Sequence, residues 1–142
     1  MKIWKLILVG GFLAGTQAAI AAETSSSGLW KLSSGKLTVK VEQCYGNKLC
    51  AKVAELAHPL RDDGTPKLDE NNPNKSLRTR PVIGIQLIDG MSPTGPNSWK
   101  GKIYNADDGH TYSAYAKLNG NALSVKGCWG PFCKNLEFAR VN

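Results

Sequence analysis

The chain is poor in the residues from which most catalytic centres are built. Its 142 residues include only 4 cysteines and 2 histidines, His58 and His110. Both histidines flank predicted turns, no Gly-x-Ser-x-Gly segment is present, and no cysteine is expected to be free. Nucleophilic catalysis needs a nucleophile held beside a base. We therefore expect no catalytic residues, no cofactor and no enzymatic activity.

The sequence also lacks an apolar run long enough for a membrane-spanning helix, and this decides between a membrane anchor and a signal peptide at the N-terminus. Residues 1–5 form a basic start, residues 6–15 are apolar, and residues 19–21 offer the small side chains that a signal peptidase reads. The apolar run is shorter than the roughly 20 residues that a spanning helix needs, and no cysteine follows it as a lipid anchor would require. We predict a signal peptide over residues 1–22 and one exported domain over residues 23–142 that does not span the membrane.

The predicted mature chain is basic. Removing Lys2 and Lys5 leaves 16 basic against 11 acidic residues, a net charge of +5. The lysines are spread over many predicted strands, and aromatic residues fall mostly on inward positions. This pattern does not favour a nucleic acid partner.

The cysteines predict two disulfides. They occur as Cys44-x5-Cys50 and Cys128-x4-Cys133, an even number in a chain bound for export. A zinc site built from both pairs is the alternative, but neither pair has zinc-knuckle spacing. We expect the bridges Cys44–Cys50 and Cys128–Cys133 and no metal site. The acidic residues of the long loop lack EF-hand spacing and are interpreted as turn formers.

Alternating apolar residues separated by Gly and Asn turns predict an all-β domain. The expected strands number about eight, and no helix of useful length is expected. They cover residues 28–32, 36–42, a third ending near 57, 82–88, 99–105, 110–118, a seventh around 123–126, and 136–141. Up-and-down strands of this number close most simply into an antiparallel barrel, which removes exposed edges.

Turn positions predict three strand registers. A turn at Ser34-Gly35 places Trp30 opposite Val39. Placing Cys44 directly opposite Cys50 sets Glu42 opposite Lys52 and Val41 opposite Val53, and a turn at Asp108-Gly109 sets Ile103 opposite Ala114 and Trp99 opposite Leu118.

The long connection, residues 58–80, ends in Arg78 and Arg80, which two hypotheses explain. The arginines bind Asp69 or Glu70 of the same segment, which we favour because the loop needs contacts that hold its shape, or they clamp an anionic ligand. The following run, residues 82–88, is apolar on both faces and needs a cover. The folded-back connection or a weak dimer contact would supply it.

One set of residues, spread over most of the chain, carries a family resemblance. It consists of Asp69, Asn72-Pro73, Arg78, Arg80-Pro81 and Gly84, of Trp99, Gly101 and residues 103–104 and 109–112, and of residues 28–30, Cys128, Cys133 and Arg140. With these residues the chain resembles the domain of unknown function 2147 family of small secreted bacterial proteins. The resemblance implies a lipocalin-like barrel in the periplasm or secreted medium. It also implies that Trp30 and Arg140 close one end of the barrel, with the arginine lying across the indole.

The predicted interior contains both small and large side chains. Gly101, Ala51, Ala114 and Ala116 leave space, whereas Trp30, Trp99 and Tyr112 consume it. This balance slightly favours a filled core over a ligand cavity, since an eight-stranded barrel allows either.

Two functions remain. The first is binding of a small anionic or apolar ligand at the barrel mouth. The second is a protein-interaction or structural role in the envelope, without a ligand, for a monomer or weak dimer. For the first, the candidate ligand-binding residues are Arg78, Arg80, Trp99, Tyr112, Ala114 and Ala116.

Overall fold

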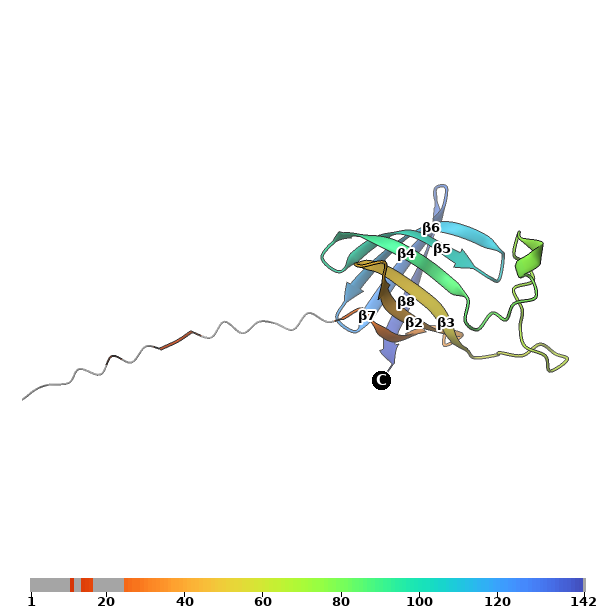
Figure 1. Cartoon of the computed structure of the whole chain (residues 1–142), viewed down its shortest axis with the longest axis horizontal. Coiled ribbons are helices and arrows are strands. Elements are labelled where there is room, and N and C mark those ends of the chain that lie inside the picture. The colour runs from red at the N-terminus through yellow and green to blue at the C-terminus, as the bar shows by residue number, and fades with distance from the viewer. Residues whose placement is uncertain (1–10, 12–13, 17–24, 142) are drawn as a thin grey trace, which may run out of the picture.

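The computed structural model describes residues 11, 14–16 and 25–141, and it forms one closed barrel of eight antiparallel strands (Figure 1). Each strand pairs with the next, and β8 pairs with β1. The strands are β1 (Gly28–Leu32), β2 (Leu37–Cys44), β3 (Lys48–Leu56), β4 (Gln86–Gly95), β5 (Ser98–Asn105), β6 (His110–Asn119), β7 (Ala122–Trp129) and β8 (Phe132–Val141). The prediction of an all-β, up-and-down, eight-stranded barrel is confirmed.

Little else interrupts the barrel in the part of the chain that the structure describes. One 3-10 turn, η1 (Lys75–Leu77), lies in the long connection between β3 and β4. None of the described residues forms a helix long and apolar enough to cross a membrane. The predicted signal peptide, residues 1–22, lies almost entirely outside the described residues.

Alternate residues of each strand face the interior, because successive side chains of a strand point to opposite faces. The register pairs Trp30 with Val39, as predicted. The buried core draws on every strand except β5, whose Trp99 and Ile103 are only partly buried against it. It consists of Trp30, Val39, Val41, Leu49, Ala51, Ile88, Met91, Ala114, Ala116, Leu118, Leu123, Val125 and Phe138.

Two predicted registers were wrong, each by two residues. In the β2–β3 pair Glu42 lies opposite Cys50, and Val41 lies opposite Ala51. The disulfide Cys44–Cys50 forms as predicted, but it joins diagonal positions whose Cα atoms are 5.9 Å apart. Glu42 therefore forms its ion pair with Lys40 of its own strand, at 3.0 Å, rather than with Lys52. A shift of two residues leaves every side chain on its original face, so the predicted inner face survives the error.

The β5–β6 hairpin shows the second register error. Asn105 pairs with His110, so the loop contains four residues, 106–109, instead of a two-residue turn, and Ile103 lies opposite Tyr112. The cause is Gly109, which is buried with φ 73°. A Cβ atom there would lie 1.8 Å from the carbonyl oxygen of Asn71. The long connection thus packs directly on this loop, and only glycine permits the approach.

The predicted limits of β4 and β8 also need correction. Residues 82–85 belong to the long connection, and β4 continues through residues 92–95, which were expected to be a loop. The last strand begins at Phe132 rather than at residue 136. Cys128 lies directly opposite Cys133, with a Cα–Cα distance of 4.1 Å, so the disulfide extends the β7–β8 ladder where a loop was expected.

One end of the barrel is closed by Trp30, which has no exposed surface. The Arg140 guanidinium lies 4.3 Å from the centroid of the indole ring. The indole Nε1 donates to the Ser26 carbonyl at 2.8 Å, and Arg140 donates to the carbonyls of Ser25 and Ser27. Residues 25–27 are thereby held against the base of the barrel, and the cation is stacked on the ring as the family resemblance implied.

Replacing Trp30 tests this closure. Trp30→Ala should lower the free energy of unfolding by about 3–5 kcal/mol, because it removes a fully buried aromatic side chain. Arg140→Ala should cost less, since it removes only stacking and two surface hydrogen bonds. Urea denaturation measures both. Trp129→Ala is the control, since it makes the same change at a tryptophan that is 55% exposed. Equal losses at the two tryptophans would contradict the closure.

Candidate ligand-binding site

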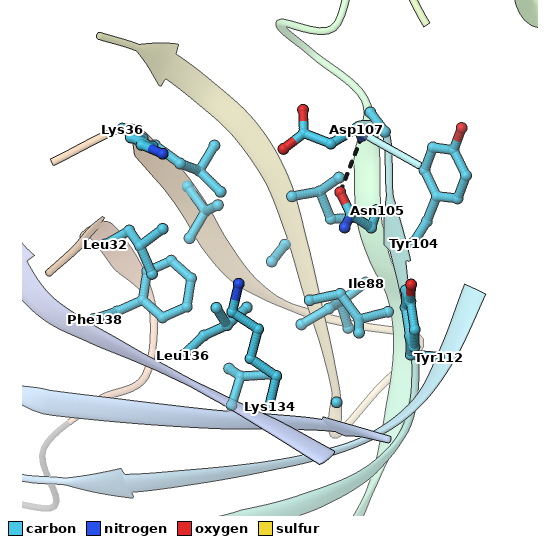
Figure 2. Close-up of a pocket in the computed structure, with 18 of the residues that line it drawn as sticks. Leu32, Lys36, Ile88, Tyr104, Asn105, Asp107, Tyr112, Lys134, Leu136 and Phe138 are labelled. Carbon is cyan, nitrogen blue, oxygen red and sulfur yellow. Dashed lines mark hydrogen bonds between the residues drawn. The ribbon is translucent and has the colours of Figure 1, made fainter. Parts of the chain in front are cut away.

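The candidate site lies at the end of the barrel opposite to the base that Trp30 closes. The β1–β2, β3–β4, β5–β6 and β7–β8 connections all lie at this end. A cavity of about 1030 Å³ lies inside the barrel and reaches the connections at this end (Figure 2). This volume lies at the upper end of the roughly 300–1,000 Å³ of typical small-molecule sites. The slight preference for a filled core was therefore wrong for the open half of the barrel.

The deep walls of the cavity are apolar. Figure 2 shows Leu32, Ile88, Leu136 and Phe138 around one space, although they come from β1, β4 and β8. Their side chains line the same space because they occupy inner-facing positions, and inner-facing side chains of every strand point towards the barrel axis. An apolar body that enters here loses water-exposed surface, which is the main favourable contribution to its binding.

Three aromatic rings stand together at one side of the mouth. The His110 and Trp129 ring centroids are 5.0 Å apart, and those of Tyr112 and Trp129 are 5.6 Å apart. Both pairs meet edge to face, a favourable arrangement for aromatic rings. The Tyr112 hydroxyl donates to Asp108, and this contact raises the pKa of the phenol. The cluster joins the start of β6 to the end of β7.

Cations and carboxylates both reach the rim. Lys134 follows the inner-facing alternation of β8, and Figure 2 shows its amine projecting into the cavity. Lys36 and Lys67 line the rim from the β1–β2 turn and the long connection. None of these lysines has an ion-pair partner among the described residues. Asp107 lies on the opposite side of the mouth, and its neighbour Asp108 is already bound to Tyr112.

The long connection is held beside this mouth by the buried carboxylate of Asp69. Arg80 contacts Asp69 Oδ2 at 2.9 Å through both Nε and Nη2. Asn72 Nδ2 donates to the same oxygen at 2.8 Å, and the Tyr104 hydroxyl donates to Oδ1 at 2.5 Å. Burial, followed by the hydrogen bond to Asp69, raises the pKa of Tyr104 to about 12. Since Tyr104 belongs to β5, this contact fastens the connection to the barrel.

Several other charged side chains of the connection also bind within it. Arg78 Nε donates to the Asn72 carbonyl at 2.7 Å, and Arg61 pairs with Glu70 at 3.0 Å. Asp63 accepts from the backbone and hydroxyl of Thr65, as expected for a turn-forming aspartate.

The structure separates the predicted ligand-binding residues. Tyr112 alone lines the cavity, whereas Arg78 and Arg80 bind within the connection. Trp99 lies opposite Ala116, beside the β4–β5 turn at the closed end, and Ala114 has no exposed surface. The predicted site therefore joins residues from opposite ends of the barrel.

Sequence reasoning missed Lys134, Trp129 and Phe132 at the mouth. A signal for them was present, because placing Cys128 directly opposite Cys133 puts Trp129 opposite Phe132 and Gly127 opposite Lys134. Alternation from Leu136 then assigns Lys134 to the inner face.

The comparisons with known proteins agree with this architecture. The model of a family described as "uncharacterized protein conserved in bacteria (DUF2147)" matches residues 28–140, which is most of the chain. The chain belongs to the DUF2147 family. Its resemblance to that family, inferred above from motifs, is thus confirmed.

A solved structure similar to this DUF2147 protein is HP1028 from the human pathogen Helicobacter pylori, described as a member of the lipocalin family. The two are 28% identical, the match covers 82% of each chain, and the TM-score is 0.68. This supports the description of the barrel as lipocalin-like. No curated protein matches the chain.

Removing the Asp69 carboxylate tests its role. Asp69→Ala should lower the free energy of unfolding by about 3–5 kcal/mol, as when one partner of a buried ion pair is deleted. It should also expose the connection, residues 57–85, to limited proteolysis. The neighbouring Glu70→Ala is the matched control, because it breaks a solvent-exposed pair worth about 0–1 kcal/mol. Protease resistance that is equal in both variants would show that Asp69 does not hold the connection.

The raised pKa of Tyr104 predicts a pH dependence. The folded state favours the protonated phenol, so its contribution to stability is complete below the ordinary pKa of 10.0 and is lost as the pH rises towards about 12. Wild type should therefore exceed Tyr104→Phe in unfolding free energy at neutral pH, and the difference should shrink between these values. Chemical denaturation across the alkaline range measures it. A constant difference would contradict the assignment.

Proposed function

We propose that this DUF2147 protein binds a small amphiphile with an anionic head group. The apolar body occupies the cavity and the head group lies at the rim beside Lys134. The observation that carries the proposal is one cavity of about 1030 Å³ with apolar deep walls and an inner-facing lysine at its entrance. Charge-assisted hydrogen bonds from an ammonium to a carboxylate or phosphate are about twice as strong as neutral ones.

The two cations in the inner-facing row of β8 have different uses. Arg140, at the closed end, is bound to Trp30 and to backbone carbonyls. Lys134, near the open end, has no ion-pair partner among the described residues. Its stem can lie along the apolar wall while its amine reaches the aqueous mouth. Lys36 and Lys67 add positive charge at the same rim. An anion is therefore favoured over a cation, although Asp107 provides a competing site for an amine.

Binding without catalysis is the role that the rim supports. His110 packs edge to face against Trp129, and the nearby Asp108 is bound to Tyr112, so these groups form a wall of the mouth. The likeness to a lipocalin supports a binding function only as an analogy of fold. The site itself, with its apolar cavity and few polar groups at the mouth, is the stronger argument.

Three ligands with the same alkyl chain separate the head-group preferences: dodecanoate, dodecanol and dodecylammonium. Calorimetric titration below the concentrations at which they form micelles should give the tightest binding for dodecanoate and the weakest for dodecylammonium. Trp129, which lines the mouth, should report the same order by its fluorescence. Preference for dodecylammonium would assign the head-group site to Asp107. Absence of binding by all three would favour the envelope-interaction role.

Two variants locate the ligand. Lys134→Glu should weaken dodecanoate binding about tenfold or more, the scale of one lost charge-assisted hydrogen bond. Lys126→Glu makes the same charge change on the outer face of β7, beside Asn135, and should have little effect. Gly127→Leu should fill the cavity, because a Cβ there would meet only ordinary contacts at 3.7 Å from Ile103 and Tyr112. Dodecanoate binding that survives Gly127→Leu would place the ligand outside the barrel.

A further inference from the structure

The tip of the β7–β8 hairpin exposes two large aromatic side chains. Trp129 lies opposite Phe132 around the turn residues Gly130 and Pro131, and these aromatics are 55% and 78% exposed. Figure 1 shows this hairpin, drawn in blue, extending beyond the ends of the neighbouring strands. Both aromatics continue inner-facing rows of the barrel past the rim, so they stand at the edge of the cavity mouth.

We propose that this tip docks the protein on a phospholipid bilayer that contains anionic lipids. Trp129 and Phe132 enter the interfacial region, and the cavity mouth then faces the membrane. The benefit of this orientation rests on the proposed function: an amphiphile could pass between the bilayer and the cavity with little exposure to water.

The tip is built to keep its shape. The Cys128–Cys133 disulfide joins the pair of residues immediately behind the aromatics, and the Trp129 ring packs against His110 and Tyr112. A preformed apolar tip loses little conformational entropy when it binds. The bridge therefore holds both aromatic side chains at the end of the hairpin whether or not they are in contact with a bilayer.

The shape of the tip favours a bilayer over a protein partner. A stable protein interface buries about 800 Å² on each side, which needs a broad complementary surface. A protruding tip with two aromatic side chains offers much less area, whereas the membrane interface accepts such a tip without shape complementarity. Indole rings are favoured at the headgroup level, and apolar groups that lie in this interface enter by about 5–10 Å.

Three lysines lie on or near the strands that form the tip. Lys134 lies on its cavity side, and Lys126 lies opposite Asn135 on its outer side. Lys102 lies two strands away from Cys128 across the sheet. It pairs with Ser113 of β6, and Ser113 pairs with Cys128 of β7. None of the three has an ion-pair partner among the described residues. Cations beside an apolar insertion favour anionic headgroups, and the attraction falls with salt.

Vesicle binding tests the proposal. The oxidised protein should co-sediment with vesicles of phosphatidylcholine and phosphatidylglycerol, less with phosphatidylcholine alone, and less at high salt. The tryptophan emission should shift to shorter wavelength, because the exposed Trp129 enters the interface, whereas Trp30 is fully buried and Trp99 lies at the opposite end of the barrel. Phe132→Ser should reduce the partition coefficient about tenfold or more, the scale of one exposed aromatic side chain that is no longer buried. Tyr115→Ser is the control, since it removes an aromatic that is 45% exposed on the outer face of β6.

Two results would overturn the proposal: vesicle binding by Phe132→Ser equal to that of wild type, or no vesicle binding by the wild type. Loss of a dimer in Phe132→Ser, measured by ultracentrifugation without vesicles, would instead assign the tip to a second copy of the chain. Unchanged melting temperature shows that Phe132→Ser is folded. Gly127→Leu separates this proposal from the ligand proposal, because it should abolish dodecanoate binding and retain vesicle binding. Wild-type dodecanoate binding without vesicle binding would refute only the membrane inference.

Discussion

The open end of the barrel depends on the buried carboxylate of Asp69. A carboxylate with no exposed surface is unfavourable unless donors replace the lost water. Two of its donors, Arg80 and Asn72, belong to the long connection, and the third, Tyr104, belongs to β5. The contact that folds the connection therefore also attaches it to the barrel. Together with the close approach of Asn71 to Gly109, it holds the connection against the β5–β6 loop, so that His58 and Lys67 are the residues it contributes to the cavity wall.

The location of the cavity shows that small residues do not by themselves create space. Ala114 and Ala116 were interpreted as the wall of a ligand site and Gly101 and Ala51 as leaving space, but only Ala51 lines the cavity. A Cβ on Gly101 would lie 2.9 Å from Met91 Cγ, and Ala114 has no exposed surface. Interiors pack densely, so a small residue usually marks a large one across from it. The cavity instead opens at the other end of the barrel, where the strands continue into the β1–β2, β3–β4, β5–β6 and β7–β8 connections.

Sequence alone predicted the fold class, the strand order, the inner face and both disulfides, and it could do so because these depend on alternation. Alternation has a period of two, so the inner face was right even where the register was wrong by two residues. Register itself depends on loop geometry, and in β5–β6 the loop packs against Asn71, which lies in a distant segment of the sequence. The rule that bridged cysteines lie directly opposite failed for Cys44–Cys50, which is diagonal, and would have succeeded for Cys128–Cys133. Spacing within a sequence does not distinguish these geometries, because both satisfy the distance that a disulfide requires.

The row of inner-facing residues on β8 connects the fold to both proposals. From base to tip it contains Arg140, Phe138, Leu136, Lys134 and Phe132. The arginine is stacked on the indole that closes the barrel, the next two side chains wall the cavity, the lysine lies at its mouth, and the last phenylalanine is the most exposed hydrophobic side chain of the described residues. One strand thus extends from the packed core at the closed end, along the cavity wall, to the exposed apolar tip of the β7–β8 hairpin. An exposed apolar side chain contributes nothing to folding stability, and the disulfide next to Phe132 holds this side chain in its exposed position. Its burial can therefore release free energy only when the protein binds something outside the barrel.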